Sequence, residues 1–158
     1  MGEAPTKAWT KLVGGASAEI AWYVSIASDG SIYIAGSTKS SIDGQINNGY
    51  DDAFIAKFNS DGSKAWIKLL GGASHEVAQS VSTASDGSIY IAGNTMSSFD
   101  GQSNNGGVDA FITKFNSDGS KVWTKLVGGA SNDNAQSVSI ASDGYIYIAG
   151  STGGSIDS

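Results

Sequence analysis

The 158-residue chain is 40% hydrophobic and 15% charged, a composition that fits one globular domain and excludes a disordered chain. Its net charge is −6 and its nine basic residues are all lysines without a basic cluster, so no nucleic-acid partner is expected. No run of about 18 apolar residues would span a membrane, and the lack of cysteine excludes disulfides and thiolate metal sites.

The chain repeats itself every 57 residues without a gap, as the spacing of Trp9, Trp66 and Trp123 shows. Residues 9–65 and 66–122 differ at 15 of 57 positions, and the third copy differs from the second at 12 of its 36 positions. Copies this similar indicate recent duplication or deliberate design. Residues that the copies share therefore reflect common descent and are not by themselves signs of selection.

The predicted strands follow this repeat in chain order. First comes a lone strand over 7–13, then two complete four-stranded units at 21–70 and 78–127, and then a partial unit at 135–158 with two strands. The strands expected in the second unit cover 79–84, 88–94, 109–115 and 120–127. Asp-Gly turns in "ASDGS" and "FNSDGS" join them in pairs, because glycine takes the positive φ that a tight hairpin requires.

Four strands per unit predict an all-β fold of β-propeller blades, each blade an antiparallel sheet. A single blade cannot bury both of its faces, so it packs against neighbours around an axis. The small residues around Val81 fit the crowded centre of such a ring, whereas the strand that carries Trp66 fits the wider rim. The chain, 1–158, is interpreted as one propeller module of about 2.7 repeats.

The stretch "SDGSIYIAGST", followed by "DAFIAKFNSDG", resembles the bacterial SBBP repeat, which is named for an inferred seven-bladed β-propeller. The resemblance covers nearly the whole chain. It implies a propeller without a defined activity, because the family has no catalytic motif, and an extracellular or cell-surface location. One departure matters: seven blades at this period need about 400 residues, more than twice the length of this chain.

An arc of three blades cannot bring its own ends together, so it leaves apolar faces and strand edges open at both ends. The lone strand over 7–13 is suited to complete a blade that begins at the other terminus. Two copies would give six blades, within the usual range of four to eight, and three copies would give nine. The expected function is therefore a non-enzymatic scaffold that self-assembles, with a homodimer favoured over a homotrimer. The alternative is a fragment of a longer propeller.

The loop before the third strand of each unit is rich in oxygen-bearing side chains that suit Ca²⁺. The candidate ligands are Asp43, Asn47 and Asp52 and their counterparts Asp100, Asn104 and Asp109. The spacing differs from that of an EF-hand loop. Ordinary turn chemistry, in which Asp and Asn bond to their own backbone, explains the same composition and is favoured over a metal.

Three aromatic residues occur only in the first unit, namely Trp22, Tyr23 and Tyr50. Aromatic faces beside Asn and Asp are typical of sugar recognition, so a carbohydrate-binding lectin is the alternative function and a glycan the alternative partner. Packing at the seam between chains is the favoured interpretation, because aromatic residues are also enriched at subunit interfaces.

No catalytic residue is predicted. His75 is the only histidine, and no Ser or Cys partner arrangement surrounds it. Glu19, Glu76 and Asp133 occupy equivalent positions and would line one end of the ring. Paired carboxylates hydrolyse glycosides only at suitable separations, which a sequence does not give. Symmetric repetition argues against an enzyme, which normally needs one asymmetric site.

Overall fold

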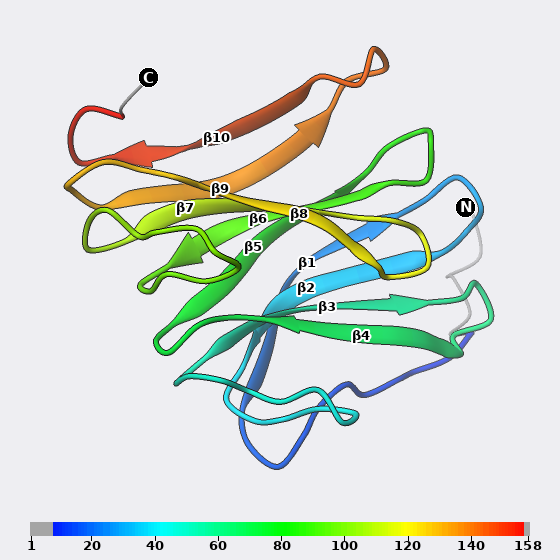
Figure 1. Cartoon of the computed structure of the whole chain (residues 1–158). Coiled ribbons are helices and arrows are strands. Elements are labelled where there is room, and N and C mark those ends of the chain that lie inside the picture. The colour runs from blue at the N-terminus through cyan, green and yellow to red at the C-terminus, as the bar shows by residue number, and fades with distance from the viewer. Residues whose placement is uncertain (1–7, 157–158) are drawn as a thin grey trace, which may run out of the picture.

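The computed structural model describes residues 8–156, which contain ten strands and no helix. Figure 1 shows them as two four-stranded antiparallel sheets and one hairpin. The first sheet consists of β1 (Glu19–Ile26), β2 (Ile32–Thr38), β3 (Asp52–Phe58) and β4 (Lys64–Leu70). The second consists of β5 (Glu76–Thr83), β6 (Ile89–Thr95), β7 (Asp109–Phe115) and β8 (Lys121–Val127). The hairpin pairs β9 (Asp133–Ile140) with β10 (Ile146–Thr152).

The three sheets are stacked face to face in chain order, with the first sheet at one end and the β9–β10 hairpin at the other (Figure 1). In each four-stranded sheet the strands lie in the order of the sequence. Strand β5 packs against β1, β2 and β3 of the first sheet, and β9 packs against β5, β6 and β7 of the second. The fold class is therefore confirmed: the chain is all-β, and its open sheets are blades of a partial propeller.

Two of the three hydrophobic core clusters lie between neighbouring blades, and we call these two seams, whereas the third, which includes Phe54 and Ile67, lies within the first blade. The first seam, between the two complete blades, joins Tyr33 and Ile55 of the first blade to Val81, Ile91 and Phe111 of the second. The second seam joins the second blade to the hairpin through a smaller cluster of Tyr90, Ala92, Ala110, Ile112, Ala135 and Val138. Each blade is thus stabilised mainly by its neighbours, as expected of a propeller.

The predicted Asp-Gly hairpin turns are confirmed. Gly30 and Gly87 have φ values of 80° and 81°, in the left-handed region that glycine adopts at no steric cost. In the first of these turns, Asp29 Oδ1 accepts a hydrogen bond of 2.8 Å from the Ser31 backbone N–H. That bond and the Ser31 hydroxyl lower the pKa of Asp29. The side chain therefore helps to hold the turn that its sequence predicts.

The strand predicted over 7–13 is not formed in the described part of that segment, residues 8–13. Lys7 lies outside the described residues. In a complete blade the rim strand pairs with the third strand, as β4 pairs with β3, whereas within residues 8–156 no strand pairs with the segment 8–13. The segment nevertheless lies beside the first blade, because a Cβ atom at Gly62 would collide with the Trp9 indole. Trp66 covers Gly119 in the same way one repeat later.

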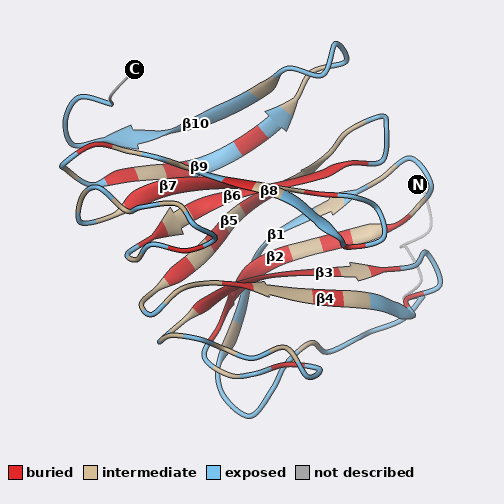
Figure 2. Ribbon diagram, viewed as in Figure 1, coloured by how far each residue is buried: buried red, intermediate tan, exposed pale blue. Residues whose placement is uncertain are grey.

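Burial falls sharply at the two ends of the stack (Figure 2). Strands β6 and β7 in the middle are almost completely buried, whereas most of β1 and nearly all of β10 are exposed. The described residues include no helix that is long and apolar enough to cross a membrane.

Candidate functional site at the blade seams

A pair of buried carboxylates stands at one end of the first seam. Asp52 is the first residue of β3, and Glu76 is the first residue of β5 in the next blade. Both are fully buried. A Cβ atom at Gly71 would collide with Asp52 Oδ1 and would lie 2.8 Å from Glu76 Oε2, so the two carboxylates converge on this glycine. The close approach explains why the linker between β4 and β5 has no side chain at this position.

Glu76 is held by a complete set of hydrogen bonds. Its Oε1 accepts bonds from the hydroxyls of Thr95 at 2.8 Å and Ser97 at 2.6 Å, and its Oε2 accepts the backbone N–H of Gly72 at 2.8 Å. Buried carboxylates need this degree of satisfaction, because desolvation otherwise makes their charge unfavourable. The Glu76 network ties the start of β5 to the end of β6.

Asp52 is satisfied on one side only. Its Oδ2 accepts the Asn48 backbone N–H at 3.0 Å, whereas its Oδ1 has no hydrogen-bond partner among the described residues. Burial, together with the nearby charge of Glu76, raises the pKa of Asp52 above its ordinary value of 3.8. The pair resembles a general acid–base arrangement in its chemistry but is shut off from solvent, so a structural role fits its geometry better.

The second seam repeats the arrangement with a shorter acid. Asp109 and Asp133 converge on Gly128 as Asp52 and Glu76 converge on Gly71. Asp133 Oδ2 accepts the Gly129 backbone N–H at 2.8 Å. The Thr152 hydroxyl is the main cause that lowers the pKa of Asp133. The sequence placed Glu19, Glu76 and Asp133 at one end of the ring, but the acidic partner contributed by the third strand was missed.

One cluster distinguishes the first seam from the second. His75 Nδ1 lies 2.6 Å from Asp51 Oδ2, and the His75 ring stacks on Tyr50 with 5.1 Å between ring centres and 14° between planes. At the second seam the equivalents of these residues are Gly107, Val108 and Asn132, so neither contact recurs. His75, for which the sequence predicted no partner, therefore belongs to an asymmetric group of three side chains.

The structure gives the predicted Ca²⁺ ligands several different partners. Asp43 forms an ion pair with Lys64, and Asp100 forms the equivalent pair with Lys121. The amide nitrogen of Asn47 donates to the carbonyl of Thr38, and Asn104 repeats this contact. Asp52 and Asp109 are the seam acids already described. Within residues 8–156, no three acidic or histidine side chains form a group suited to a metal ion.

The three aromatic residues of the first unit lie in two places. Trp22 and Tyr23 stand at the β-bulge of β1, where the register with β2 shifts, and both are about half exposed. Tyr50 lies in the loop before β3 and is 71% exposed. No aromatic contact of the described residues joins Tyr50 to the other two. Their predicted ligand role therefore involves two separate surfaces.

The two ends of the stack expose residues that the internal seams bury. Val24 on β1 is 57% exposed, whereas its equivalent in the second blade, Val81, is 2% exposed. Tyr147 on β10 is 60% exposed, whereas its equivalent in the first blade, Tyr33, is 2% exposed. We call the first surface the β1 face and the second the β10 face. Each presents one half of a seam.

Comparisons with known proteins agree with this architecture. Residues 27–64 and 84–121 match a family model described as a β-propeller domain of unknown function (DUF5122). Residues 122–157 match the SBBP β-propeller repeat model. The chain is also similar to regulatory protein FlaEY of Caulobacter vibrioides, with 26% identity over 136 residues. That similarity covers 77% of this chain and 14% of the relative, so the chain spans a small part of the relative's length.

Proposed function

The chain belongs to the SBBP-type family of β-propeller repeats, and we propose that it is a non-enzymatic scaffold that completes its ring with a second copy of itself. The burial of the seam carboxylates supports a role without catalysis, because a substrate has no access to them. The similarity to a protein named as regulatory also supports an interaction role.

The observation that carries the proposal is the match between the β10 face and the β1 face. In the first seam, Tyr33 of one blade and Val81 of the next belong to one buried cluster. In the second seam, Tyr90 and Val138 do the same. Tyr147 on the β10 face is equivalent to Tyr33 and Tyr90, and Val24 on the β1 face is equivalent to Val81 and Val138. When the β10 face of one copy packs on the β1 face of a second copy, Tyr147 and Val24 come together as these tyrosines and valines do in the two seams.

The N-terminal segment supports the same joint. Trp66 lies 6.0 Å from Tyr33 between ring centres, and Trp123 lies 6.1 Å from Tyr90. Among the described residues no tyrosine ring packs on Trp9 in this way. When the β1 face of a second copy packs on the β10 face, its Trp9 meets Tyr147, and its N-terminal segment takes the rim position of the third blade.

Contact between two different faces builds a ring or a filament according to whether its rotation closes. Two copies give six blades, which lies within the usual range of four to eight. A homodimer is therefore the proposed assembly, and each of its two seam blades combines β9 and β10 of one copy with the N-terminal segment of the other.

Mass in solution tests this assembly. We expect light scattering across a dilution series to give twice the chain mass of 16.1 kDa. Val24→Glu should shift the mass to that of a single chain, because closure would bury an unpaired carboxylate. Ile46→Glu is the matched control, since Ile46 is an exposed apolar residue on a loop, and it should leave the dimer intact.

A single-chain mass for the unmodified protein at every concentration contradicts the proposal. A mass three times that of the chain would support closure of the ring but contradict a ring of six blades.

A second candidate function is glycan binding at the first seam. The exposed Tyr50 ring is supported from behind by His75, and the Asp51 carboxylate lies beside it, a combination of flat ring and polar groups that suits a sugar. A glycan array should then give a signal that Tyr50→Ala abolishes and Trp22→Ala leaves unchanged. An array without signal would reject it.

A further inference from the structure

The acid at the start of the innermost strand has fewer hydrogen-bond donors in the third copy of the repeat than in the first two. Glu76 accepts hydrogen bonds from two hydroxyls, and Glu19 accepts the same two bonds one copy earlier. In the third copy the acid is Asp133, which is one methylene shorter than glutamate. One of the two hydroxyls is also missing, because Gly154 occupies the position of Ser97. The third copy therefore cannot form the same network.

The difference comes from the side chains and not from the course of the backbone. The backbone N–H of Ser97 donates to the Thr95 hydroxyl at 3.0 Å. One repeat later, the backbone N–H of Gly154 donates to the Thr152 hydroxyl at 3.2 Å. All of these positions lie within residues 8–156. The second seam thus keeps the local backbone of the first seam, and it has one hydroxyl and one methylene fewer around its acid.

Two buried carboxylate oxygens at the second seam have no hydrogen-bond partner among the described residues, namely Asp109 Oδ1 and Asp133 Oδ1. Asp109 is fully buried, and Asp133 is only 2% exposed. The two carboxylates converge, because a Cβ atom at Gly128 would lie 2.5 Å from Asp109 Oδ1 and 3.0 Å from Asp133 Oδ2. At the first seam only one such oxygen, Asp52 Oδ1, is without a partner. Buried oxygens in this state need a bound ligand or water.

The charge of the two acids is not balanced by a lysine. The ion pairs of the described residues involve Asp43, Asp51 and Asp100. The Thr152 hydroxyl lowers the pKa of Asp133, so this carboxylate is charged at neutral pH. Buried carboxylates without a counter-ion are unfavourable. A water molecule would supply hydrogen bonds without charge, whereas a cation supplies both a contact for the oxygens and the missing charge.

We propose that Asp109 and Asp133 bind one Ca²⁺ ion at the second seam, with the Thr152 hydroxyl oxygen and water as further ligands. Asp109 is the first residue of β7 and Asp133 the first residue of β9, so the ion joins two neighbouring blades. Among residues 8–156 no third acid or histidine completes the group, so the remaining ligands are neutral oxygens.

The all-oxygen donor set favours Ca²⁺ over other divalent ions. Ca²⁺ accepts irregular sets of carboxylate, hydroxyl and water oxygens, whereas Mg²⁺ requires a nearly ideal octahedron and gives up its water reluctantly. Zn²⁺ prefers nitrogen and sulfur ligands, which these residues do not offer. Two carboxylates also match the charge of one divalent ion.

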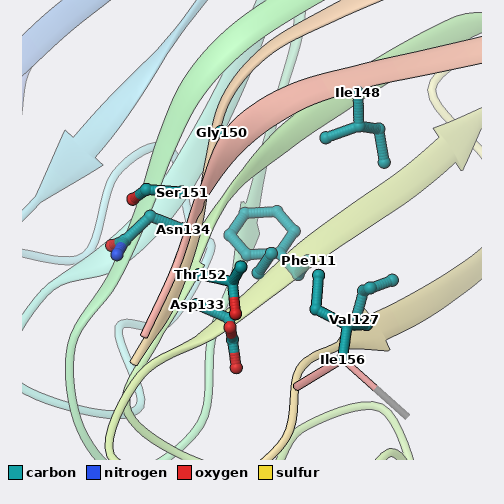
Figure 3. Close-up of a pocket in the computed structure, with 10 residues that line it drawn as sticks. Phe111, Val127, Asp133, Asn134, Ile148, Gly150, Ser151, Thr152 and Ile156 are labelled. Atoms are coloured by element: carbon teal, nitrogen blue, oxygen red, sulfur yellow. The ribbon is translucent and has the colours of Figure 1, made fainter. Parts of the chain in front are cut away.

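Figure 3 shows the Asp133 carboxylate beside the Thr152 hydroxyl. Both side chains line a cavity of about 310 Å³, which Ile148 also borders. The proposed ligands lie on one side of this cavity, so their contacts with the ion do not depend on what fills the rest of it. The site belongs to one chain and does not rest on the proposed dimer.

Isothermal titration calorimetry of the full chain with CaCl₂, after treatment with a chelator, tests the site. We expect one Ca²⁺ per chain. With Ca²⁺ at about 100 times its dissociation constant, the unfolding temperature should rise by at least about 4 °C over that in chelator. Mg²⁺ should bind at least about ten-fold more weakly.

Exchanging the acid networks of the two seams tests the location. Asp133→Glu together with Gly154→Ser rebuilds the network of the first seam, so it should abolish Ca²⁺ binding and leave the chain folded. Glu76→Asp together with Ser97→Gly should do the opposite and raise the number of bound ions to two per chain. Asp100→Asn is the matched control, because it removes an acid outside the site, and it should bind Ca²⁺ as the unmodified protein does.

Binding of one Ca²⁺ that the rebuilt network abolishes would support the proposal. The absence of binding heat and of a rise in unfolding temperature up to about 10 mM Ca²⁺ would overturn it. Unchanged binding by the chain with the rebuilt network would also overturn it. Loss of binding in Asp100→Asn would do the same, because the ion would then belong to the loop before β7.

Discussion

Strands β2 and β10 have the same seven-residue sequence, Ile-Tyr-Ile-Ala-Gly-Ser-Thr, and opposite surroundings. In β2 every residue is buried or half-buried, whereas in β10 every residue after the first is exposed. Both strands pair with an inner strand of their own blade. The difference is that β2 also has β3 at its other edge and a following blade against Tyr33.

The sequence of a strand determines which face each side chain lies on, whereas the neighbouring strands and blades determine how far that side chain is buried. The shared seven-residue sequence places Tyr33 in β2 and Tyr147 in β10 on the face toward the following blade. It places Ile34 and Ile148 on the opposite face. Burial of those side chains then depends on whether a next strand and a next blade are present. A repeat protein therefore has end units that match its middle in sequence and differ from it in stability.

The largest difference in stability is expected between Val81→Glu and Val24→Glu, the same substitution at equivalent positions of two blades. Val81→Glu puts a charge into the first seam, where Val81 is 2% exposed, and should destabilise the fold by at least about 4 kcal/mol. Val24→Glu should change the stability of the single chain by less than about 0.5 kcal/mol, because Val24 is exposed there. Urea unfolding followed by circular dichroism, at concentrations below any dimer, measures both.

Similar losses for the two variants would mean that the β1 face is covered in solution. If light scattering on the same samples then gave twice the chain mass, the covering chain would be a second copy and the samples would not be single chains.

A smaller difference in stability is expected between Ile91→Ala and Ile148→Ala, which remove apolar contacts at equivalent positions. Ile91 is fully buried, so Ile91→Ala should reduce the free energy of unfolding by about 2–5 kcal/mol. Ile148 is 42% exposed and borders the cavity, so Ile148→Ala should have an effect below about 1 kcal/mol. Chemical denaturation of the single chain tests this, and equal effects would contradict the view that the third blade is incomplete.

The sequence predicted the repeat, the hairpins and the four-stranded units, because Asp-Gly turns and alternating residues act locally. The expected strand 79–84 and the observed Glu76–Thr83 differ by three residues at the start. The predicted strand at 7–13 was wrong for residues 8–13, since a rim strand is held by hydrogen bonds to a third strand and no described strand lies beside this segment. Local patterns do not contain that information.

The seam carboxylates show the same limit on the functional side. Asp52 looked like a loop oxygen ligand, and Glu76 like a residue at the end of the ring. Only the packing of two blades brings both to Gly71 and removes them from water. The Gly-Gly linker of each repeat was the available signal, because a side chain at its first glycine would occupy the space of the acids.

Two equivalent indole rings provide the third contrast. Trp66 lies between blades, where it packs against Tyr33 and Phe115 and covers Gly119. Trp123 at the second seam meets Tyr90, but the described part of the following blade is only the β9–β10 hairpin, which has no equivalent of Phe115. Trp66→Ala should lower the free energy of unfolding by about 2–3 kcal/mol, less than a fully buried tryptophan, and Trp123→Ala by about 1 kcal/mol. Thermal unfolding of both variants measures the difference, and a larger effect at Trp123 would reject the assignment of the open end.

A modest, stabilising effect is expected at Asp52 in the complete first seam. Its raised pKa means that the folded state favours the protonated acid, so the unfavourable contribution of its charge is absent below about pH 3.8, grows as the pH rises from there to the folded-state pKa, and is constant above it. Asp52→Asn should remove this contribution and allow the new amide to donate toward Glu76. We expect a stabilisation of about 1 kcal/mol at pH 7.5 that shrinks toward pH 4.5 in urea unfolding.

Asp61→Asn provides the control of opposite sign. The Ser63 hydroxyl and backbone N–H lower the pKa of Asp61, so its charged form favours the folded state and the substitution should weaken the protein at neutral pH. If Asp52→Asn instead destabilises the protein at pH 7.5, the carboxylate pair must be favourable as it stands. That result would require a bound cation or a shared proton between Asp52 and Glu76, because two unscreened buried charges repel each other. The first seam would then be held by an ion or proton in addition to its apolar contacts.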